Sequence, residues 1–382
     1  MSKLEAVLGA GFGDEAKGLV SRWRAFQARQ ENKDARILTV FFNGGFQRAH
    51  TTAEGVYHCL AAGTAFGSDT YYQEYFIIDP IALWLEASTN RLFQQKKIKL
   101  FASPECRIVS PFDVWNNRRK ELSRGEARHG SCGMGIFETA YRSRSYPKYR
   151  LHAKDLNNPW TLWEQLRTIE EHYAACEEVD EVYTLGNFMK AADWFCRNVQ
   201  LISEYELYRD YDVIIYEGGQ GLLLDQSNEE FFPYLTPSST GLTNLIWQLT
   251  VGNFEKIDIF YVSRTYMTRH GAGPFPTECR REDINPDIKD STNISNEWQN
   301  DLRFGWYDKA LIDKNVYRNE PSKLRERSII TFNMVYTHAN YTHGQVAIGR
   351  NSLISPYEAA PEHTKQNIYL SFDKYNVEKM GE

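Results

Sequence analysis

The chain has 382 residues, of which 42% are hydrophobic and 25% are charged, and its formal net charge is −6 at pH 7. This composition allows a substantial buried core, while the acidic balance and the lack of a dense Lys/Arg block exclude a general nucleic-acid binder. No apolar run reaches about 18 residues and the six cysteines lack C-x-x-C spacing, so we expect no secretion signal, membrane span, zinc site or disulfide framework, and a cytoplasmic location.

A strand-like run at residues 4–8 leads into a glycine-rich turn at residues 9–18, which precedes a helix. Glycines let backbone N–H groups approach a phosphate, and the N-terminus of a helix attracts the same anion. The turn differs from a Walker A loop because Ala16 precedes Lys17 and Gly18 follows it. The pattern predicts a nucleotide-phosphate site, and an ordinary tight turn is the alternative.

An acidic pair, Asp14 and Glu15, stands inside this turn. Two carboxylates would repel a phosphate unless a magnesium ion bridged them or one of them took a proton. The pair therefore indicates metal or proton-transfer chemistry in the same place as phosphate binding.

Further apolar runs also end in glycines and polar side chains. The run at 37–42 is followed by Asn-Gly-Gly at 43–45, and the run at 212–216 is followed by Glu-Gly-Gly-Gln-Gly at 217–221. In an open α/β sheet ligands gather at the carboxyl ends of the strands, so these ends predict one shared site. Additional strands are expected at 98–101, 257–262 and 328–335.

Three segments are expected to elaborate one main body. Residues 116–150 are basic and Gly/Ser-rich, which is typical either of a solvated loop or of a mobile flap that brings arginines to a phosphate. Residues 158–209 are Gly-poor and amphipathic, which predicts two helices. Residues 279–325 are polar, and we expect them to be loop-like.

Five motifs follow one another along the chain: GDEAKG at 13–18, NGG with HT at 43–51, EGGQGLLLD at 217–225, FPYLT at 232–236 and TRHGAGPFPTE at 268–278. In order and spacing they resemble adenylosuccinate synthetase, from residue 4 to about residue 310. The resemblance implies an α/β, P-loop-related fold with a central, largely parallel sheet flanked by helices. It further implies a single domain at 1–382, with a flap at about 116–150 and a helical insertion at about 158–209.

That family phosphorylates the 6-oxygen of a purine nucleoside monophosphate with a nucleoside triphosphate, and then displaces the phosphate with the amino group of L-aspartate. The resemblance implies that Asp14 is the base for the purine N1–H and that His50 is an acid or hydrogen-bond donor, with a structural strand-end histidine as the alternative for His50. The implied triphosphate-binding residues are Gly11, Gly13, Glu15, Ala16, Lys17, Gly18 and Thr51. The implied monophosphate-binding residues are Asp14, Gln47, Ser131, Cys132, Gln220 and Thr236. Mg²⁺ is the implied cofactor, bound by Asp14 and the backbone near Ala49.

Several positions depart from the family's pattern. The family binds aspartate with an arginine-rich run, whereas residues 296–306 keep one arginine, so Gln299 and Arg303 are the candidates for the aspartate carboxylates. In the late strand, where the family reads guanine with Thr-Lys-x-Asp, residues 331–334 are Thr-Phe-Asn-Met. Because no carboxylate is placed there to pair with guanine, ATP or dATP is favoured over GTP as phosphoryl donor.

These departures resemble the phage-type branch of the family, which makes N6-succino-2-amino-2′-deoxyadenylate from dGMP and aspartate, a step toward DNA containing 2-aminoadenine. Asp14, where that branch often has Ser, leaves the ordinary IMP-using synthetase as the alternative. A second alternative is an inactive sensor of purine nucleotides, which the presence of the expected catalytic residues disfavours. The resemblance also implies a homodimer in which Arg142 or Arg144 reaches the substrate phosphate across the interface.

Overall fold

A ten-stranded sheet forms the centre of the computed structural model, which describes residues 2–125, 131–174, 180–289, 301–320, 324 and 329–381. The strand order is β19-β18-β15-β11-β1-β10-β2-β5-β7-β9. All neighbouring strands are parallel except β18 and β19. The strands are β1 Lys3–Gly9, β2 Ile37–Phe41, β5 Ser68–Tyr72, β7 Leu100–Ala102, β9 Val199–Leu201, β10 Val213–Gly221, β11 Lys256–Arg264, β15 Ile330–Thr337, β18 Ile368–Leu370 and β19 Glu378–Lys379.

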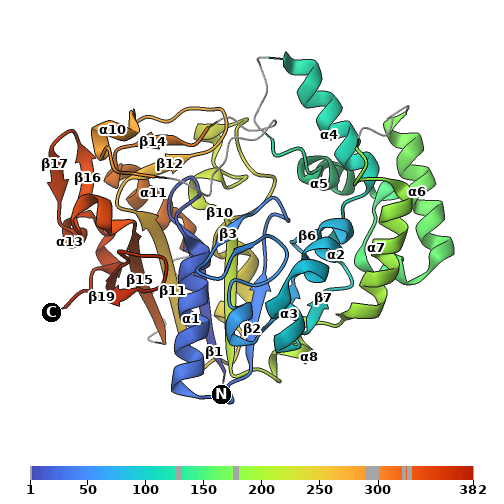
Figure 1. The fold of residues 1–382 in the computed structure, drawn as a ribbon, viewed down its shortest axis with the longest axis horizontal. Helices are drawn as coiled ribbons and strands as arrows, with labels where there is room; N and C mark the ends of the chain where they lie inside the picture. The colour runs from blue at the N-terminus through green and yellow to red at the C-terminus, as the bar shows by residue number, and fades with distance from the viewer. Residues whose placement is uncertain are drawn as a thin grey trace.

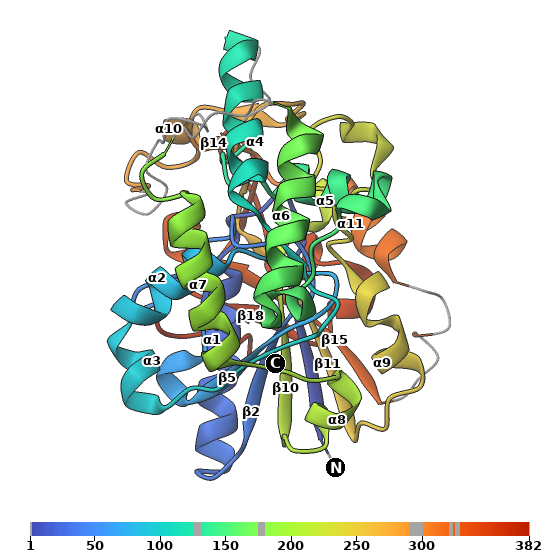
Figure 2. The ribbon, with the colours of Figure 1, turned by 90° about the vertical axis from the view of Figure 1, so that its right-hand side faces the viewer.

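Helices flank this sheet, and the larger group of them stands beyond β5 and β7. Helices α4 to α7 gather at that side, whereas the elements from β15 onward form the opposite side (Figure 1), and α6 and α7 face the viewer in Figure 2. The helices are α1 Lys17–Glu31, α2 Pro80–Thr89, α3 Arg91–Lys96, α4 Pro111–Arg124, α5 Ile136–Ser145, α6 Pro159–Tyr173, α7 Leu185–Asn198, α8 Glu204–Tyr208, α9 Ile246–Thr250, α10 Arg281–Ile284, α11 Lys309–Asn319 and α13 Pro356–Ala359. Among the described residues, none of the helices combines the length and the apolar character that crossing a membrane requires.

Short strand pairs surround the main sheet. β12 Met267–Arg269 and β13 Glu278–Cys279 both pair with β14 Arg303–Gly305 in antiparallel fashion. The remaining pairs are β3 His50–Thr51 with β4 Val56–Tyr57, β6 Ile77–Ile78 with β8 Arg107–Ile108, and β16 Val346–Gly349 with β17 Ser352–Ile354. These pairs lengthen the loops that follow the central strands.

Burial of both sheet faces explains why the central strands are continuous apolar runs. All five residues of β2 are buried, as are the last six of β1. Successive side chains of β1 enter different cores: Leu8 packs in one cluster with Tyr261, whereas Val7 packs under α1 with Trp23. The alternation clamps β1 between two layers, so the loop that follows it starts from a rigid strand.

The start of α1 differs from that of other helices. Its N-cap residue Ala16 has a left-handed backbone (φ 65°) and makes no side-chain cap, whereas Ser110 and Asp113 form a complete capping box on α4. The first backbone N–H groups of a helix lack intrahelical partners and carry the positive end of its dipole. Because no side chain caps them in α1, these groups are available to a ligand at the carboxyl end of β1.

The structure confirms the expected α/β fold with a central, largely parallel sheet and corrects two local expectations. The segment 116–150 is not a simple loop, because its described residues include most of α4 and all of α5. The segment 279–325 is not loop-like throughout, because it contains β14 and α11. The two helices expected within 158–209 are α6 and α7, and the same segment also supplies the edge strand β9.

Candidate active site

In the loop after β1, backbone donors and a lysine converge on one carboxylate. Glu15 Oε1 accepts from the N–H groups of Gly11 (2.8 Å) and Gly13 (3.1 Å), and Glu15 Oε2 accepts from Lys17 Nζ (2.8 Å). Both Glu15 and Lys17 are 3% exposed, so these bonds form away from solvent. The donors of the loop are therefore arranged around an anionic group.

Neighbouring strands fix the backbone of this loop in an unusual conformation. Asp14 and Ala16 both have left-handed backbones (φ 58° and 65°), which cost a non-glycine residue roughly 1–2 kcal/mol each. Arg264 Nε, at the end of β11, donates to the carbonyl of Asp14 (2.6 Å), and Thr337 Oγ1, at the end of β15, donates to the carbonyl of Glu15 (2.9 Å). With these carbonyls bound by the strands and the Gly11 and Gly13 N–H groups bound by Glu15, the uncapped N–H groups at the start of α1 are left for a ligand.

His50 belongs to a buried cluster with Arg48 and Glu217. Its Nδ1 lies 2.8 Å from Glu217 Oε1 and 2.9 Å from Arg48 Nη2, and Arg48 Nη2 also donates to Glu217 Oε1. The Arg48 guanidinium lies 3.7 Å from the centre of the Phe41 ring. The start of α1 packs closely against His50: a Cβ added at Gly18 would be 2.7 Å from His50 Cβ. Tight packing thus fixes the position of the imidazole.

The cluster also fixes the charges of its members. Burial and the positive charge of Arg48 lower the pKa of His50 to about 4, so the imidazole is neutral at pH 7. Burial would raise the pKa of Glu217, but the charge of Arg48 and the hydrogen bond to His50 outweigh it and lower this pKa to about 2. His50 is therefore suited to hydrogen bonding rather than to carrying a permanent charge.

A cavity of ≈ 690 Å³, here called the central pocket, opens at the carboxyl ends of these strands. It brings together residues that lie far apart in the sequence but were predicted to share one site. The predicted site residues among its lining are Gly13, Asp14, Glu15, Ala16, Lys17, Gly18, Gln47, Ala49, His50, Thr51, Cys132 and Gln220.

Several buried polar atoms on lining residues have no hydrogen-bond partner within the described part of the chain. They include His50 Nε2, Gln47 Oε1 and Gln220 Oε1. Leaving a buried polar group unpaired costs roughly 1–3 kcal/mol. The Gln220 amide fits against Gly44 because glycine has no side chain; a Cβ at this position would be 2.5 Å from Gln220 Oε1. We conclude that the pocket presents hydrogen-bonding groups that a polar ligand would pair.

The oxygen donors of the pocket fit a magnesium ion shared with a nucleotide. Asp14 contributes a carboxylate that is 26% exposed, and exposed Ala49 lines the same pocket. No group of three or more His, Cys, Asp and Glu side chains suited to hold a metal occurs in the described ranges. Mg²⁺ usually takes one or two carboxylates and completes its shell with phosphates and water, so a sparse protein contribution suits it.

Three predicted nucleotide ligands lie outside the lining of the central pocket. Gly11 donates to Glu15 beneath the loop, Ser131 Oγ accepts from Asn117 Nδ2 (3.0 Å), and the backbone N–H of Thr236 donates to the carbonyl of Leu224 (2.9 Å). Ser131 neighbours Cys132 in the lining, and burial raises the pKa of that thiol to about 11, so it stays neutral at pH 7.

The residues expected to bind aspartate are not assembled at the pocket. Arg303 Nε donates to Glu278 Oε1 (2.8 Å) and Nη2 donates to Glu278 Oε2 (2.5 Å), while Nη1 donates to the carbonyls of Gly271 (3.2 Å) and Gly273 (2.8 Å). Every guanidinium nitrogen is thus engaged, and aspartate would have to open the Glu278 pair to reach Arg303. Gln299 lies outside the described residues.

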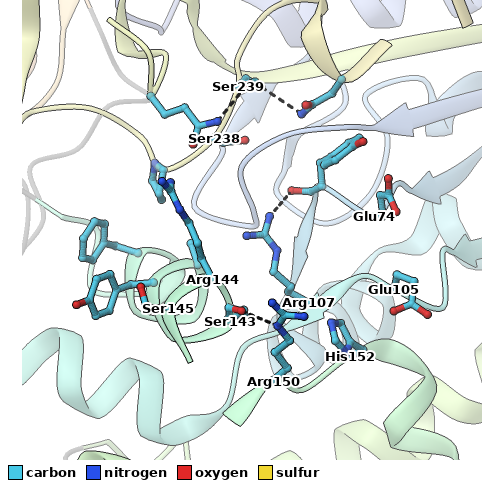
Figure 3. Close-up of a pocket in the computed structure, with 17 residues that line it drawn as sticks. Glu74, Glu105, Arg107, Ser143, Arg144, Ser145, Arg150, His152, Ser238 and Ser239 are labelled. Carbon is cyan, nitrogen blue, oxygen red and sulfur yellow. Dashed lines mark hydrogen bonds between the residues drawn. The ribbon is translucent and has the colours of Figure 1, made fainter. Parts of the chain in front are cut away.

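The two flap arginines have different environments. Arg142 is fully buried and pairs with Asp113, with both nitrogen–oxygen distances at 2.8 Å. Arg144 is exposed on α5 and lines a second cavity of ≈ 730 Å³, where it extends toward the loop that carries Ser238 and Ser239 (Figure 3). Arg142 is therefore committed to the fold, and Arg144 is accessible to a phosphate.

The expectation that residues 331–334 meet the donor base is wrong, because they lie inside β15. Asn333 is 2% exposed and donates to the carbonyl of Ile259 (3.1 Å). The strand continues to Thr337, two residues beyond the expected end, and the residues that line the pocket are Thr337, His338, Asn340 and Tyr341. The apolar pair Val335-Tyr336 was the sequence signal for this longer strand.

Sequence reasoning also overlooked three charged or titratable neighbours of the catalytic candidates. Arg48 and Glu217 surround His50, and His270 Nε2 lies 3.4 Å from Asp14 Oδ2. Each of the three residues lies in or beside one of the five motifs, but the residue that it contacts belongs to a different part of the chain. The one sequence signal for them was a polar side chain next to a glycine-rich strand end.

A family model described as Adenylosuccinate synthetase matches residues 6–328. Two curated proteins of that name, from Polynucleobacter necessarius subsp. necessarius and Neisseria meningitidis serogroup C, are 28% and 25% identical to this chain over 344 and 335 residues. The alignments cover 83% and 84% of this chain, and 74% and 75% of those proteins.

Solved structures share the fold. The fully ligated adenylosuccinate synthetase from Plasmodium falciparum gives a TM-score of 0.68 at 18% identity and covers 99% of this chain and 87% of that chain. The cyanophage S-2L succinoaminodeoxyadenylate synthetase, bound to dGMP and to dATP as an energy donor, gives a TM-score of 0.64 at 14% identity. It covers 99% of this chain and 95% of that chain. At such identities the likeness shows the fold alone.

The different environments of the flap arginines predict different effects of the same substitution. Arg142→Met leaves the buried Asp113 carboxylate without its cation and should lower the free energy of unfolding by about 3–5 kcal/mol. Arg144→Met removes an exposed side chain and should change it by less than about 0.5 kcal/mol. Urea denaturation at pH 7 measures both values, and an Arg142→Met protein as stable as Arg144→Met would contradict the structural role of Arg142.

The lowered pKa of His50 predicts a pH-dependent stability. Because the unfolded histidine has a pKa of about 6.5, the unfolded state binds more protons between pH 6.5 and 4, and the folded protein loses stability as pH falls through this window. From pH 7 to 5 this histidine should remove about 2 kcal/mol from the free energy of unfolding. His50→Gln should lack this part of the loss in parallel urea titrations, and equal losses in both proteins would refute the shift.

Proposed function

Because this chain belongs to the adenylosuccinate synthetase family of carbon–nitrogen ligases, we propose that it couples L-aspartate to C6 of dGMP or GMP with hydrolysis of ATP or dATP. The product is N6-succino-2-amino-2′-deoxyadenylate or its ribonucleotide counterpart, formed through a 6-phosphoryl intermediate. One observation carries the proposal: the anion-binding loop and the unpaired buried atoms of His50, Gln47 and Gln220 line the same pocket.

Two amide oxygens support a guanine base in the acceptor. Gln47 Oε1 and Gln220 Oε1 accept hydrogen bonds and lack a donor within the described part of the chain. Guanine offers N1–H and a 2-amino group, whereas the hypoxanthine of IMP offers N1–H without the 2-amino group. The cyanophage enzyme with the same fold binds dGMP and dATP, which is consistent with this assignment.

In the first chemical step the purine becomes a nucleophile. Asp14 takes the N1 proton, the electron pair moves to the 6-oxygen, and this oxygen attacks the γ-phosphorus while the bond to the leaving nucleoside diphosphate breaks. Lys17, once it leaves its pair with Glu15, and the uncapped N–H groups at the start of α1 hold the phosphates. The negative charge of bound phosphates favours the imidazolium form of His50, in which Nδ1–H donates to Glu217 Oε1 and Nε2–H donates to the transferring group.

In the second step the amino group of L-aspartate attacks C6. Inorganic phosphate leaves with the C6–O bond, and the amine gives up a proton. Mg²⁺, held by the Asp14 carboxylate and the Ala49 carbonyl, would neutralise charge on the triphosphate. Arg303 would meet an aspartate carboxylate only after its pair with Glu278 opens, and Gln299 is retained as the second aspartate ligand of the proposal.

Two further parts of the proposal concern the assembly and the alternative substrate. A homodimer is proposed from the family resemblance, with exposed Arg144 of α5 rather than buried Arg142 as the arginine that reaches the substrate phosphate across the interface. IMP is the alternative acceptor, favoured by the names of the curated relatives. An inactive nucleotide sensor is the alternative of another class.

Parallel assays with different acceptors test the proposal. Purified protein with Mg²⁺, L-aspartate and ATP is given dGMP, GMP or IMP, and succinylated nucleotide and ADP are followed by mass spectrometry. We expect turnover of dGMP or GMP with little from IMP, because the 2-amino group pairs with an amide oxygen of the pocket. Preference for IMP would assign the chain to the ordinary reaction, and binding without any product would assign it to the sensor class.

Substitutions of the proposed catalytic groups test their roles. Asp14→Asn and His50→Gln should each lower kcat at least about 100-fold, because each removes one proton-transfer or hydrogen-bonding group. The matched control is Asp193→Asn, which makes the same change as Asp14→Asn at an exposed position of α7. Full turnover by Asp14→Asn with intact nucleotide binding would exclude Asp14 as the base.

A further inference from the structure

The turn after β12 places a histidine beside the proposed base. His270 Nε2 lies 3.4 Å from Asp14 Oδ2, and both residues line the central pocket. No other described residue forms a hydrogen bond or an ion pair with the Asp14 carboxylate. His270 is thus the neighbour that can restrain this carboxylate, and the reaction steps given above assign it no role.

The segment that leads to His270 is fixed to the phosphate loop. Arg264 Nε donates to the carbonyl of Asp14 (2.6 Å), and Thr268 Oγ1 donates to the carbonyl of Gly13 (3.1 Å). β12 itself pairs with β14 in antiparallel fashion. Because this one segment binds two carbonyls of the loop, the loop and the segment hold each other in register. His270 adds a contact from the same segment to the side chain of Asp14.

The turn that carries His270 is closed by the preceding residue. Arg269 is 1% exposed, its Nη1 donates to the carbonyl of Pro274 (2.6 Å), and its Nη2 donates to the carbonyl of Tyr234 (3.3 Å). Its guanidinium lies 4.4 Å from the centre of the Phe12 ring. Because Arg269 joins the start of the turn to its end, the backbone is held on both sides of His270.

A carboxylate that acts as a base needs such a restraint. It must stay within hydrogen-bond reach of the proton that it takes, and a displacement of about 1 Å can cost on the order of 100-fold in rate. An imidazole Nε2–H can donate to a carboxylate oxygen whether or not Nδ1 also carries a proton, so the contact requires no particular charge on the ring. Catalytic hydrogen bonds are often long before substrate binds, so 3.4 Å is compatible with a closer contact in the complex.

We propose that His270 is a positioning residue for the ligase reaction: its Nε2–H holds Oδ2 of Asp14, which leaves Oδ1 directed at the N1–H of the acceptor purine. The inference rests on the proposed function, because Asp14 is the base in that reaction. A carboxylate oxygen has two acceptor sites, so the contact with His270 leaves the second site of Oδ2 for other ligands. His270 acts through Asp14 and does not touch the reacting atoms.

Two substitutions separate the hydrogen bond from the bulk of the ring. Full-length protein with Mg²⁺, L-aspartate, ATP and its best acceptor gives kcat and KM. His270→Leu removes the donor and should lower kcat at least about tenfold while the acceptor KM stays within about twofold, because the carboxylate is misplaced and the other ligand contacts remain. His270→Gln keeps an N–H near the position of Nε2 and should restore kcat to within about threefold of the wild type.

A double-mutant cycle tests whether His270 acts through Asp14. In the Asp14→Asn protein the base is already lost, so adding His270→Leu should change the residual kcat by less than about twofold. The matched control, His172→Leu, makes the same change on α6, outside the lining of the central pocket, and should leave kcat at the wild-type value. If His270→Leu does not fold in urea titrations, His270→Asn replaces it, because its shorter side chain withdraws the donor.

The outcomes separate failure of this inference from failure of the proposed function. Full kcat in His270→Leu, no rescue by His270→Gln, or equal losses with and without Asp14→Asn would overturn the role of His270 while the ligase activity stands. If the wild type forms no product with any acceptor, the proposed function fails. A crystal structure of the protein with dGMP then decides the inference by geometry: a separation of His270 Nε2 and Asp14 Oδ2 below about 3.2 Å supports it, and a longer one overturns it.

Discussion

The structure depends on holding a strained backbone loop at the end of a rigid strand. β1 is clamped between two apolar layers, and the loop after it carries two non-glycine residues in left-handed conformations. Side chains from β11 and β15 bind the loop carbonyls, so the strain is offset by the sheet rather than by the loop itself. A Cβ at Gly221 of β10 would be 2.1 Å from the carbonyl of Gly11, which shows how closely the neighbouring strand fits beneath. As a consequence, the N–H groups at the start of α1, which no side chain caps, lie at the end of this rigid strand.

On the β2 side of the loop, burial controls which side chains are charged. Arg48 and Glu217 have side chains with no solvent exposure and together hold His50 in place, while burial and the charge of Arg48 lower the pKa of His50 and keep it neutral. A buried pair of this kind contributes little net stability but would be costly to break, because the remaining charge would stay in the core. The pair is therefore best understood as fixing geometry and protonation, which a hydrogen-bonding catalyst needs.

Arginines that form ion pairs with carboxylates of the fold differ from those that a substrate can reach. Arg142 binds Asp113 inside the helical layer, and Arg303 binds Glu278 beside β14, so two arginines suited by charge to a phosphate or carboxylate already have acidic partners. Arg144 is exposed, and Lys17 pairs with a carboxylate of its own loop, Glu15. The availability of each cation follows from its partner rather than from its residue type.

The sequence by itself determined the local elements and the place of the site. Apolar runs, glycine turns and polar strand ends are patterns within about ten residues, so β1, the loop, α1, β2 and β11 followed from them, as did the gathering of Asp14, Lys17, His50 and Gln220 at one edge of a parallel sheet. Tertiary structure alone decided which charges pair. Arg48 and Glu217 are 169 residues apart, and Arg142 and Asp113 are 29 apart. The true end of β15, and with it the position of Asn340, was also fixed by pairing with β11. Such choices depend on long-range packing, because an arginine has the same local signature whether its partner is a buried carboxylate or a substrate.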